Sequence, residues 1–350
     1  GVLYDETCTT PLGNTWARTV CVKPPINEFE KPYWDLYASA TFQGGCPANG
    51  STRVYNDTKI WNQPGKTDWK QSDDWKPVGV PDIKKCVIAR TPVELPSGTN
   101  GLARSVIVKP GGSVSVRTNS NLEVQNHVKN QAAAADFLVE SDANLKQNND
   151  ASVNEGSITV KRDAKMKRLD YTYWGSPVTG QNLKAFSNGT LDNRFYVYRE
   201  VDDYFDGVFA FSKSGAYDGS LMADAFPLQN KNTYDFEITK GYAIRAPNNY
   251  TSTNTIFNGT FVGVPNNGGI KNFKLKYTDA AHGNNFVANP YPSNIDFSKL
   301  YADNSDYMYY TAWFWTNVNP NPVMQGSNYP SQYLGVDYYN NYAIYNGSGG

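Results

Sequence analysis

Three short segments of alternating residues, spaced eight residues apart, constrain the fold of this chain more than any other feature. They are SVIV (105–108), SVSV (113–116) and NLEV (121–124), joined by the turn sequences KPGG and RTNS. Val-x-Val alternation has the two-residue period of a strand, not the 3.6-residue period of a helix. Short strands on a short fixed period predict a parallel β-solenoid, in which each strand stacks on a strand of the next turn. An antiparallel meander of hairpins is the alternative that this pattern leaves open.

The alternation continues beyond these three segments, in DFLVES (136–141), ANLKQ (143–147) and GSITVKR (156–162). The last turn of a solenoid is an open edge that can pair with another chain, so we expect some later part of this chain to lie against it. The aromatic segment DYTYWGSPV (170–178) follows across the basic linker KRDAKMKR (161–168). We therefore expect it to open a new domain that packs near the end of the solenoid.

The rest of the chain, from residue 170 to 350, alternates between short strands and turns rich in Gly, Asn and Pro. Seven more alternating segments are RFYVYRE (194–200), GVFAFS (207–212), TYDFEITKGYAIRAP (233–247), NTIFNGTFVGVP (254–265), KNFKLKY (271–277), NNFVANPYP (284–292) and YMYYTAWFWTNV (307–318). Many short strands with such turns predict a jelly-roll-like β-sandwich.

We therefore predict an all-β chain in three parts. Residues 1–57 form a small disulfide-bearing β unit that ends a preceding domain, residues 58–165 form a Trp-rich cap and the β-solenoid, and residues 166–350 form a β-sandwich that is incomplete at its C-terminus. The composition agrees, because aromatic residues reach 14% while the Ala, Leu, Glu and Lys runs that support helices are scarce.

Four cysteines, Cys8, Cys21, Cys46 and Cys86, all lie in the first quarter of the chain. An even, clustered set in a β-rich chain predicts two disulfides and an oxidising compartment. Three pairings are open, of which we favour Cys8 with Cys21 and Cys46 with Cys86. A zinc site is the alternative, but the CxxC pairs typical of such sites are missing.

Three tryptophans, Trp61, Trp69 and Trp75, stand among polar residues ahead of the solenoid. Such rings either cover the open end of a β core or remain exposed, where their faces stack on sugar rings. Capping is the favoured interpretation, and ligand stacking is the functional alternative. For Trp174, Trp313 and Trp315 we expect core packing, with residues 307–318 buried on both faces.

Acidic turns are candidate calcium sites. Asp202, Asp203 and Asp206 precede Gly207 and offer carboxylate oxygens, and Asp303, Asn304 and Asp306 form a second such turn. Neither spacing matches an EF-hand loop, so a solvated turn competes with each. Apart from calcium, no cofactor is expected.

No catalytic motif stands out. His127 and His282 lie outside any nucleophile or metal motif, and neither G-x-S-x-G nor HExxH occurs. The parallel β-helix fold hosts polysaccharide lyases and hydrolases, but the solenoid strands here carry few acids. We therefore assign no catalytic residue.

The charge pattern and the hydropathy exclude two classes of partner. The net charge is −1, so no overall field attracts nucleic acid, and the cluster Lys161, Arg162, Lys165, Lys167 and Arg168 is explained as a charged linker. No apolar run approaches the ~18 residues of a membrane helix, so we expect a chain that does not span a membrane.

Several longer motifs resemble a module of secreted Bacteroidota cell-surface proteins that the type IX secretion system exports, among them gliding-motility-type adhesins. The motifs occur in the expected order as WNQPGKTDWKQSDDWKPVGVPD, DYTYWGSPVTGQNLKAFS, RFYVYRE, GYAIRAP, FNGTFVGVPNNGG, NNFVANPYPSNIDFSKL and AWFWTN, across residues 56–350. The C-terminal sorting domain usual in such proteins is not visible in this sequence.

The resemblance implies a non-catalytic, secreted, cell-surface adhesin or structural module, cut from a larger protein. It also implies an extracellular glycan or other surface ligand as partner, and type IX translocon components at the outer membrane. The alternative from a different class is a carbohydrate-binding or polysaccharide-degrading β-helix module.

Overall fold

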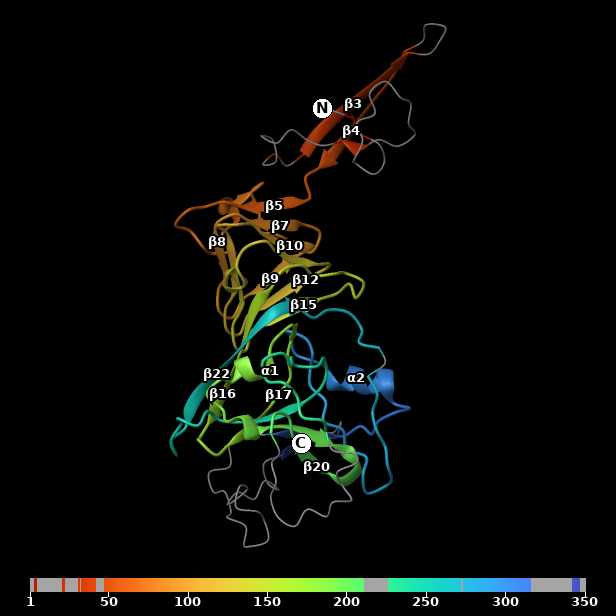
Figure 1. The fold of residues 1–350 in the computed structure, drawn as a ribbon. Coiled ribbons are helices and arrows are strands. Elements are labelled where there is room, and N and C mark those ends of the chain that lie inside the picture. Colours follow the sequence, from red (N-terminus) through yellow and green to blue (C-terminus); the bar gives the residue numbers. More distant parts are fainter. Residues whose placement is uncertain are drawn as a thin grey trace.

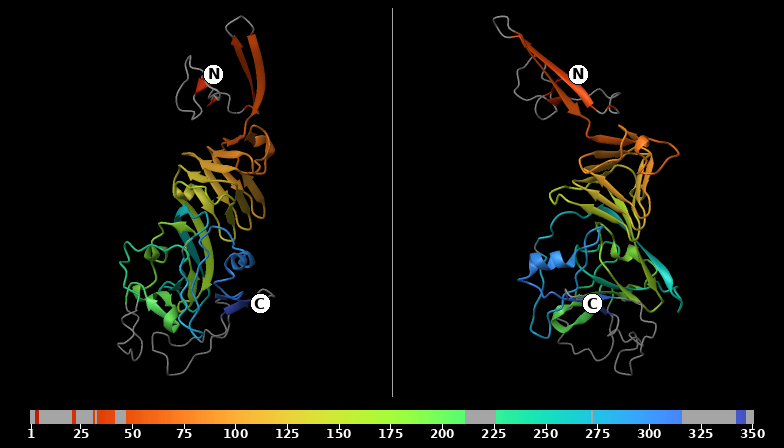
Figure 2. Two further views of the ribbon diagram at one scale, coloured as in Figure 1. Left: turned by 90° about the vertical axis from the view of Figure 1, so that its right-hand side faces the viewer. Right: turned by 180° about the vertical axis from the view of Figure 1, so that it is seen from behind.

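The computed structural model describes residues 3–4, 21–22, 31, 33–41, 47–210, 226–271, 273–315 and 342–346. The predicted fold class is confirmed, because the chain is mostly β and contains a β-solenoid of about three turns. The molecule is elongated in every view, with a hairpin at one end, the solenoid in the middle and a wider β part at the other end (Figure 1 and Figure 2).

The solenoid has three walls of stacked strands. The first holds β13 (Val128–Asn130), β10 (Ser105–Val108), β7 (Cys86–Ala89), β5 (Thr58–Trp61) and the antiparallel β6 (Trp75–Lys76). The second holds β14 (Phe137–Val139), β11 (Ser113–Val116) and β8 (Pro92–Leu95). The third holds β15 (Asn144–Gln147), β12 (Asn121–Val124) and β9 (Asn100–Ala103).

The eight-residue spacing in the sequence is the step from one wall to the next within a single turn. SVIV, SVSV and NLEV are β10, β11 and β12, and each pairs in parallel with a strand one turn away. The parallel pairing excludes the antiparallel meander. Inward valines and leucines such as Val106, Val114 and Leu122 are fully buried and stack into one continuous core.

The hairpin at the N-terminal end consists of β3 (Tyr33–Thr41) and β4 (Pro47–Tyr55), paired antiparallel along their whole length. Two short strands, β1 (Leu3–Tyr4) and β2 (Cys21–Val22), pair with each other. The predicted disulfides are not supported here. Cys8 and Cys46 lie outside the described residues, as does the side chain of Cys21.

Cys86 is a free thiol, so the favoured pairing with Cys46 is wrong. It belongs to the first wall of the solenoid, in β7, rather than to the N-terminal unit. Its Sγ accepts hydrogen bonds from Arg104 Nη2 and Nε, at 3.0 and 3.2 Å, one turn further along the same wall.

The basic linker predicted at residues 161–168 is instead mostly strand. β16 (Ile158–Met166) pairs in parallel with β14 through Thr159 and Val160, and in antiparallel with β22 (Thr255–Pro265) along all nine of its residues. Its first residues therefore belong to the last turn of the solenoid, and its second half belongs to the C-terminal part. Lys161, Asp163 and Lys165 share one face of this strand, and Arg162 lies on the other face with Val160 and Met166.

Two β layers make up the C-terminal part. One is the antiparallel sheet β17 (Tyr171–Trp174), β21 (Tyr242–Arg245), β19 (Phe195–Arg199) and β20 (Tyr204–Gly207). The other continues the second wall through β16 and β22 to β18 (Val178–Thr179). Trp174 of the first layer packs on Phe257 and Phe261 of the second, so an aromatic core lies between them.

The remaining elements are short. The helices are α1 (Leu183–Phe186), α2 (Phe297–Asn304) and the 3₁₀ turns η2 (Ser72–Asp74), η3 (Ala134–Asp136), η4 (Asp192–Arg194) and η5 (Glu200–Asp202). β23 (Ala312–Trp315) pairs with β24 (Tyr342–Tyr345). Across the part of the chain that the structure describes, every helix is too short or too polar to cross a bilayer.

Candidate functional site

The three tryptophans ahead of the solenoid are buried, so ligand stacking on Trp61, Trp69 and Trp75 is wrong. Each has 0% of its surface exposed. The ring of Trp75 lies 5.0 Å from both of the other rings, edge to face in each case. The indole nitrogen of Trp61 donates to Pro92 O at 3.0 Å, and that of Trp75 donates to Trp69 O at 2.8 Å. The rings form the predicted cap on the first turn.

The other predicted aromatic positions divide between core and surface. Trp174 is buried as expected, with 7% exposed. Trp315 is partly buried, stacks on Tyr173 with 4.9 Å between ring centroids, and donates to Tyr171 O at 2.6 Å. Trp313 is 53% exposed, so the expectation that this segment is buried on both faces is wrong. The reason is that β23 lies in a two-stranded sheet rather than in a central position.

The acidic turn around Asp206 is held by protein groups. Asp206 Oδ2 accepts from the backbone nitrogen of Phe226 at 2.9 Å and lies 3.7 Å from Arg199 Nη1. Asp203 accepts from the hydroxyl of Tyr198. The side chain of Asp202 is outside what the structure describes. No group of three or more His, Cys, Asp or Glu side chains that could hold a metal is found among the described residues. Calcium at this turn stays a prediction.

The second acidic turn and the two histidines lie apart. Asp303 and Asp306 are exposed at the end of α2. His282 Nδ1 lies 2.9 Å from Asp279 Oδ1 on an exposed turn, and His127 Nδ1 lies 3.5 Å from Ser105 Oγ on the first wall. Among the residues that the structure describes, neither histidine is joined to both a nucleophile and an acid in a triad.

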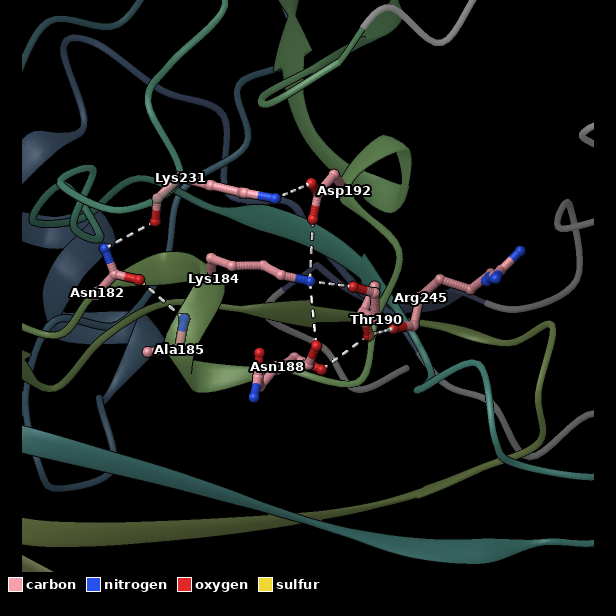
Figure 3. A network of polar contacts seen from close by, with 9 residues as sticks. Asn182, Lys184, Ala185, Asn188, Thr190, Asp192, Lys231 and Arg245 are labelled. Atoms are coloured by element: carbon pink, nitrogen blue, oxygen red, sulfur yellow. Dashed lines mark hydrogen bonds and ion pairs between the residues drawn. The ribbon is translucent and has the colours of Figure 1, made fainter.

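A polar network fixes the turn after α1 (Figure 3). Lys184 Nζ donates to the carbonyls of Thr190 and Asn188 and lies 3.2 Å from Asp192 Oδ1. Lys231 Nζ reaches the other oxygen of Asp192 at 2.5 Å. These hydrogen bonds hold the pKa of Asp192 below its usual range, that of Lys231 contributing most. Because its ammonium is fully occupied by protein oxygens, we interpret Lys184 as structural.

The junction below the solenoid joins segments that are far apart in the sequence. The amide of Leu145 in β15 donates to Pro292 O at 2.8 Å, and the amide of Asn294 donates to Asn144 Oδ1 at 2.8 Å. Asn154 Nδ2 donates to Pro265 O at 2.9 Å. The residues NPYPSN (289–294) therefore cover the lower edge of the third wall.

Two pockets adjoin this junction, and Tyr291 lines both. The first, of about 230 Å³, is polar and lies between β15 and residues 266–269, with Lys146, Asp150 and Asn267 on its walls. The second, of about 290 Å³, is lined by aromatic rings and by Arg162. The sequence analysis missed both, because the lining residues come from five separate segments. The available signal was the Pro- and Asn-rich motif that contains Tyr291.

Comparison with known proteins adds a family but no function. Neither the curated proteins nor the solved structures contain a match. One family model matches residues 60–350, which begin in β5 and include the solenoid, the junction and the C-terminal part. On this evidence the chain belongs to the family DUF8693, a domain of unknown function.

Proposed function

We propose that this chain is a non-catalytic, secreted, cell-surface module with a structural or adhesive role, within a larger protein that the type IX secretion system exports. The observation that carries the proposal is that the solenoid is covered at both ends by the chain itself. Where the end strands of the solenoid are covered, they no longer offer a template for other chains, which favours a self-contained rod.

At the upper end, β5 and β6 lie beyond β7 on the first wall. On the second wall, Trp69 N donates to Glu94 O at 2.9 Å and Glu94 N donates to Thr67 O at 2.6 Å. At the lower end of the first wall, Asn130 N donates to Glu155 O at 2.8 Å. β16 continues the second wall, and on the third wall Pro292 O accepts from the amide of Leu145.

Side-chain ladders on the outer surface tie successive turns together. Arg117 Nη2 lies 2.6 Å from Glu94 Oε2 and its Nη1 lies 2.7 Å from Glu140 Oε1, so one guanidinium spans three turns. On the third wall, Asn121 donates to Asn100 at 2.8 Å and Asn144 donates to Asn121 at 2.7 Å. Such ladders support a stiff shaft, since each turn is bonded to both of its neighbours.

The export route and the bacterial phylum rest on the resemblance of the sequence motifs. Solenoid carboxylates such as Glu94 and Glu140 are engaged in ion pairs rather than set opposite each other across a groove. This arrangement favours the structural interpretation over a polysaccharide-degrading β-helix, because glycoside hydrolysis needs two acids flanking a bound sugar.

The direct test is surface labelling of intact cells of the native source with antibodies against this chain. We expect labelling without lysis, loss of the label after external protease, and a native polypeptide heavier than 38.9 kDa. A cytosolic protein labelled only after lysis is the control. Labelling of this chain only after lysis would contradict the proposal. Release of reducing ends from a panel of acidic and neutral polysaccharides would instead favour the enzyme alternative.

A further inference from the structure

The second pocket contains a cation, Arg162, that forms no ion pair with the described residues, although the charge of the nearby Asp142 carboxylate acts on it. It lies between β16, the end of β17 and residues 286–291, and Arg162 is the one charged residue among the described residues that line it. Arg162 lies on the face of β16 that also carries Val160 and Met166, which are buried. Its side chain therefore leaves the strand on the face toward the junction, and it remains partly exposed there.

The contacts of Arg162 leave most of its donors unused. Its Nη1 donates to Lys161 O at 2.7 Å and to Glu140 O at 3.3 Å. Among the described residues it forms no ion pair, whereas Arg117 and Arg199 each pair with carboxylates. Burial lowers the pKa of Arg162 from its ordinary value. A partly buried guanidinium with open donors favours a bound anion, because a hydrogen bond between two charged groups is stronger than one between neutral groups.

The rest of the pocket wall is aromatic and closely packed. Tyr173, Phe286 and Tyr291 are half-buried, so part of each ring is accessible. The rings of Tyr173 and Phe286 are 4.5 Å apart. A Cβ on Gly175 would lie 2.0 Å from the Cβ of Ala288 across the pocket wall, so this position accepts only glycine. The wall is thus built before any ligand arrives.

We propose that this pocket binds one carboxylate-bearing sugar ring, such as the uronic acid residue of an acidic polysaccharide. The carboxylate would pair with the free donors of Arg162, a bidentate geometry that guanidinium favours. The sugar's C–H face would lie on the accessible rings. A volume of about 290 Å³ is at the lower end of the range for small-molecule sites and fits one ring.

This inference deepens the proposed adhesive role and rests on it for the source of the ligand. Its test is separate, because the pocket can be titrated on the purified chain whether or not that chain reaches a cell surface. Failure of surface labelling would remove the cellular role only, and failure of the titration would remove the ligand class only.

The experiment is a calorimetric titration of the full 350-residue chain with galacturonic acid, galactose and benzoate. We expect galacturonate to bind and galactose to bind at least about tenfold more weakly, since a charge-assisted hydrogen bond is worth about 1.5–3 kcal/mol. The variant Arg162→Gln should bind galacturonate at least about tenfold more weakly than the unmodified chain does. The variant Phe286→Leu should bind both sugars more weakly. Arg90→Gln is the matched control, because Arg90 is exposed on the solenoid and its replacement removes the same charge.

Three results would overturn the proposal. They are no binding of galacturonate to the unmodified chain, equal binding to Arg162→Gln and to the unmodified chain, and tighter binding of benzoate than of galacturonate. The first and the third are measured on the unmodified protein, so a folding defect in a variant cannot obscure them.

Discussion

At the scale of single residues, the tryptophan cap shows what a local sequence pattern leaves undetermined. Trp61, Trp69 and Trp75 stand among Lys, Asp, Gln and Asn, and this setting is compatible with exposed rings. In the structure all three rings face the core, and some of their polar neighbours, such as Lys59 and Asp74, are buried as well. No two-residue or 3.6-residue period runs through this irregular segment, so the sequence alone does not specify which way each ring points.

Replacing Trp75 by Ala should destabilise the solenoid by about 3–5 kcal/mol, as expected for deleting a buried aromatic side chain. Trp75 contacts both other rings and donates to Trp69 O, so its loss opens a cavity at the centre of the cap. Urea unfolding measures the loss. Trp313→Ala is the matched control, since that side chain is 53% exposed, and it should cost less than about 1 kcal/mol. Equal losses would mean that the cap does not stabilise the solenoid.

Arg117 gives a pH-dependent prediction. Burial raises the pKa of Glu140, but the hydrogen bonds from Arg117 and Thr118 outweigh it, so the pKa lies below its usual 4.5. A carboxyl with a lowered folded-state pKa stabilises the fold fully above about pH 4.5, and this contribution is lost as the pH falls further. Arg117→Gln should therefore lower the free energy of unfolding by about 0.5–1 kcal/mol at pH 7. This free energy should also fall less steeply between pH 4.5 and pH 3 than it does in the unmodified chain.

The measurement for this prediction is the urea midpoint of both proteins between pH 7 and pH 3. Arg90→Gln serves as its control, because among the described residues Arg90 has no side-chain hydrogen bond or ion pair, and its acid profile should match that of the unmodified chain. An unchanged profile for Arg117→Gln would indicate that the ladder contributes nothing to stability in solution.

At the scale of elements, the walls of the solenoid and the cap on its first turn were predictable, but the residues that cover its last turn were not. The Val-x-Val period specifies strands, and the fixed spacing of the turns specifies stacking, so β10, β11 and β12 follow directly from the sequence. The cover of β15 comes from Pro292, which is distant in the chain and lies outside the repeating segments of the solenoid. Contacts between residues so far apart leave no local pattern.

The variant Gly156→Ala tests whether residues 155–156 pack closely against β13, the last strand of the first wall. Gly156 has a φ of +80°, and a Cβ there would lie 1.9 Å from Asn130 O at the end of β13. Gly65 has a similar φ of +79°, but a Cβ added to it would have no neighbouring atom within 4 Å. Gly65→Ala should therefore cost only the backbone strain, about 1 kcal/mol, and Gly156→Ala should cost at least about 2 kcal/mol more.

Thermal and urea unfolding of the two glycine variants provide the comparison, and hydrogen exchange of residues 128–130 locates the effect. Faster exchange in Gly156→Ala alone is expected, because Glu155 must move away from the amide of Asn130. If both variants lose the same stability, the close approach at Gly156 does not matter and the cover is not packed against β13.

At the scale of the whole molecule, the covers at both ends of the solenoid predict how the chain associates. Residues 58–83 supply the upper cover, through β5, β6 and the segment that bonds to Glu94. Without them, β7 and β8 would present unpaired backbone groups and the apolar ends of the core. Exposed parallel strands of this kind recruit other chains.

We therefore expect the complete chain to sediment as a monomer of 38.9 kDa. A truncated chain that starts at residue 56 should also remain monomeric, because it loses β1 to β4 and keeps the cover. A chain that starts at residue 84 should form dimers or larger species, since Val87, Ala89 and Val93 would lose the residues above them. Sedimentation velocity distinguishes these cases. If the chain that starts at residue 84 is folded and monomeric, the cover is dispensable. Association would then be prevented by the charged side-chain ladders on the outer surface instead.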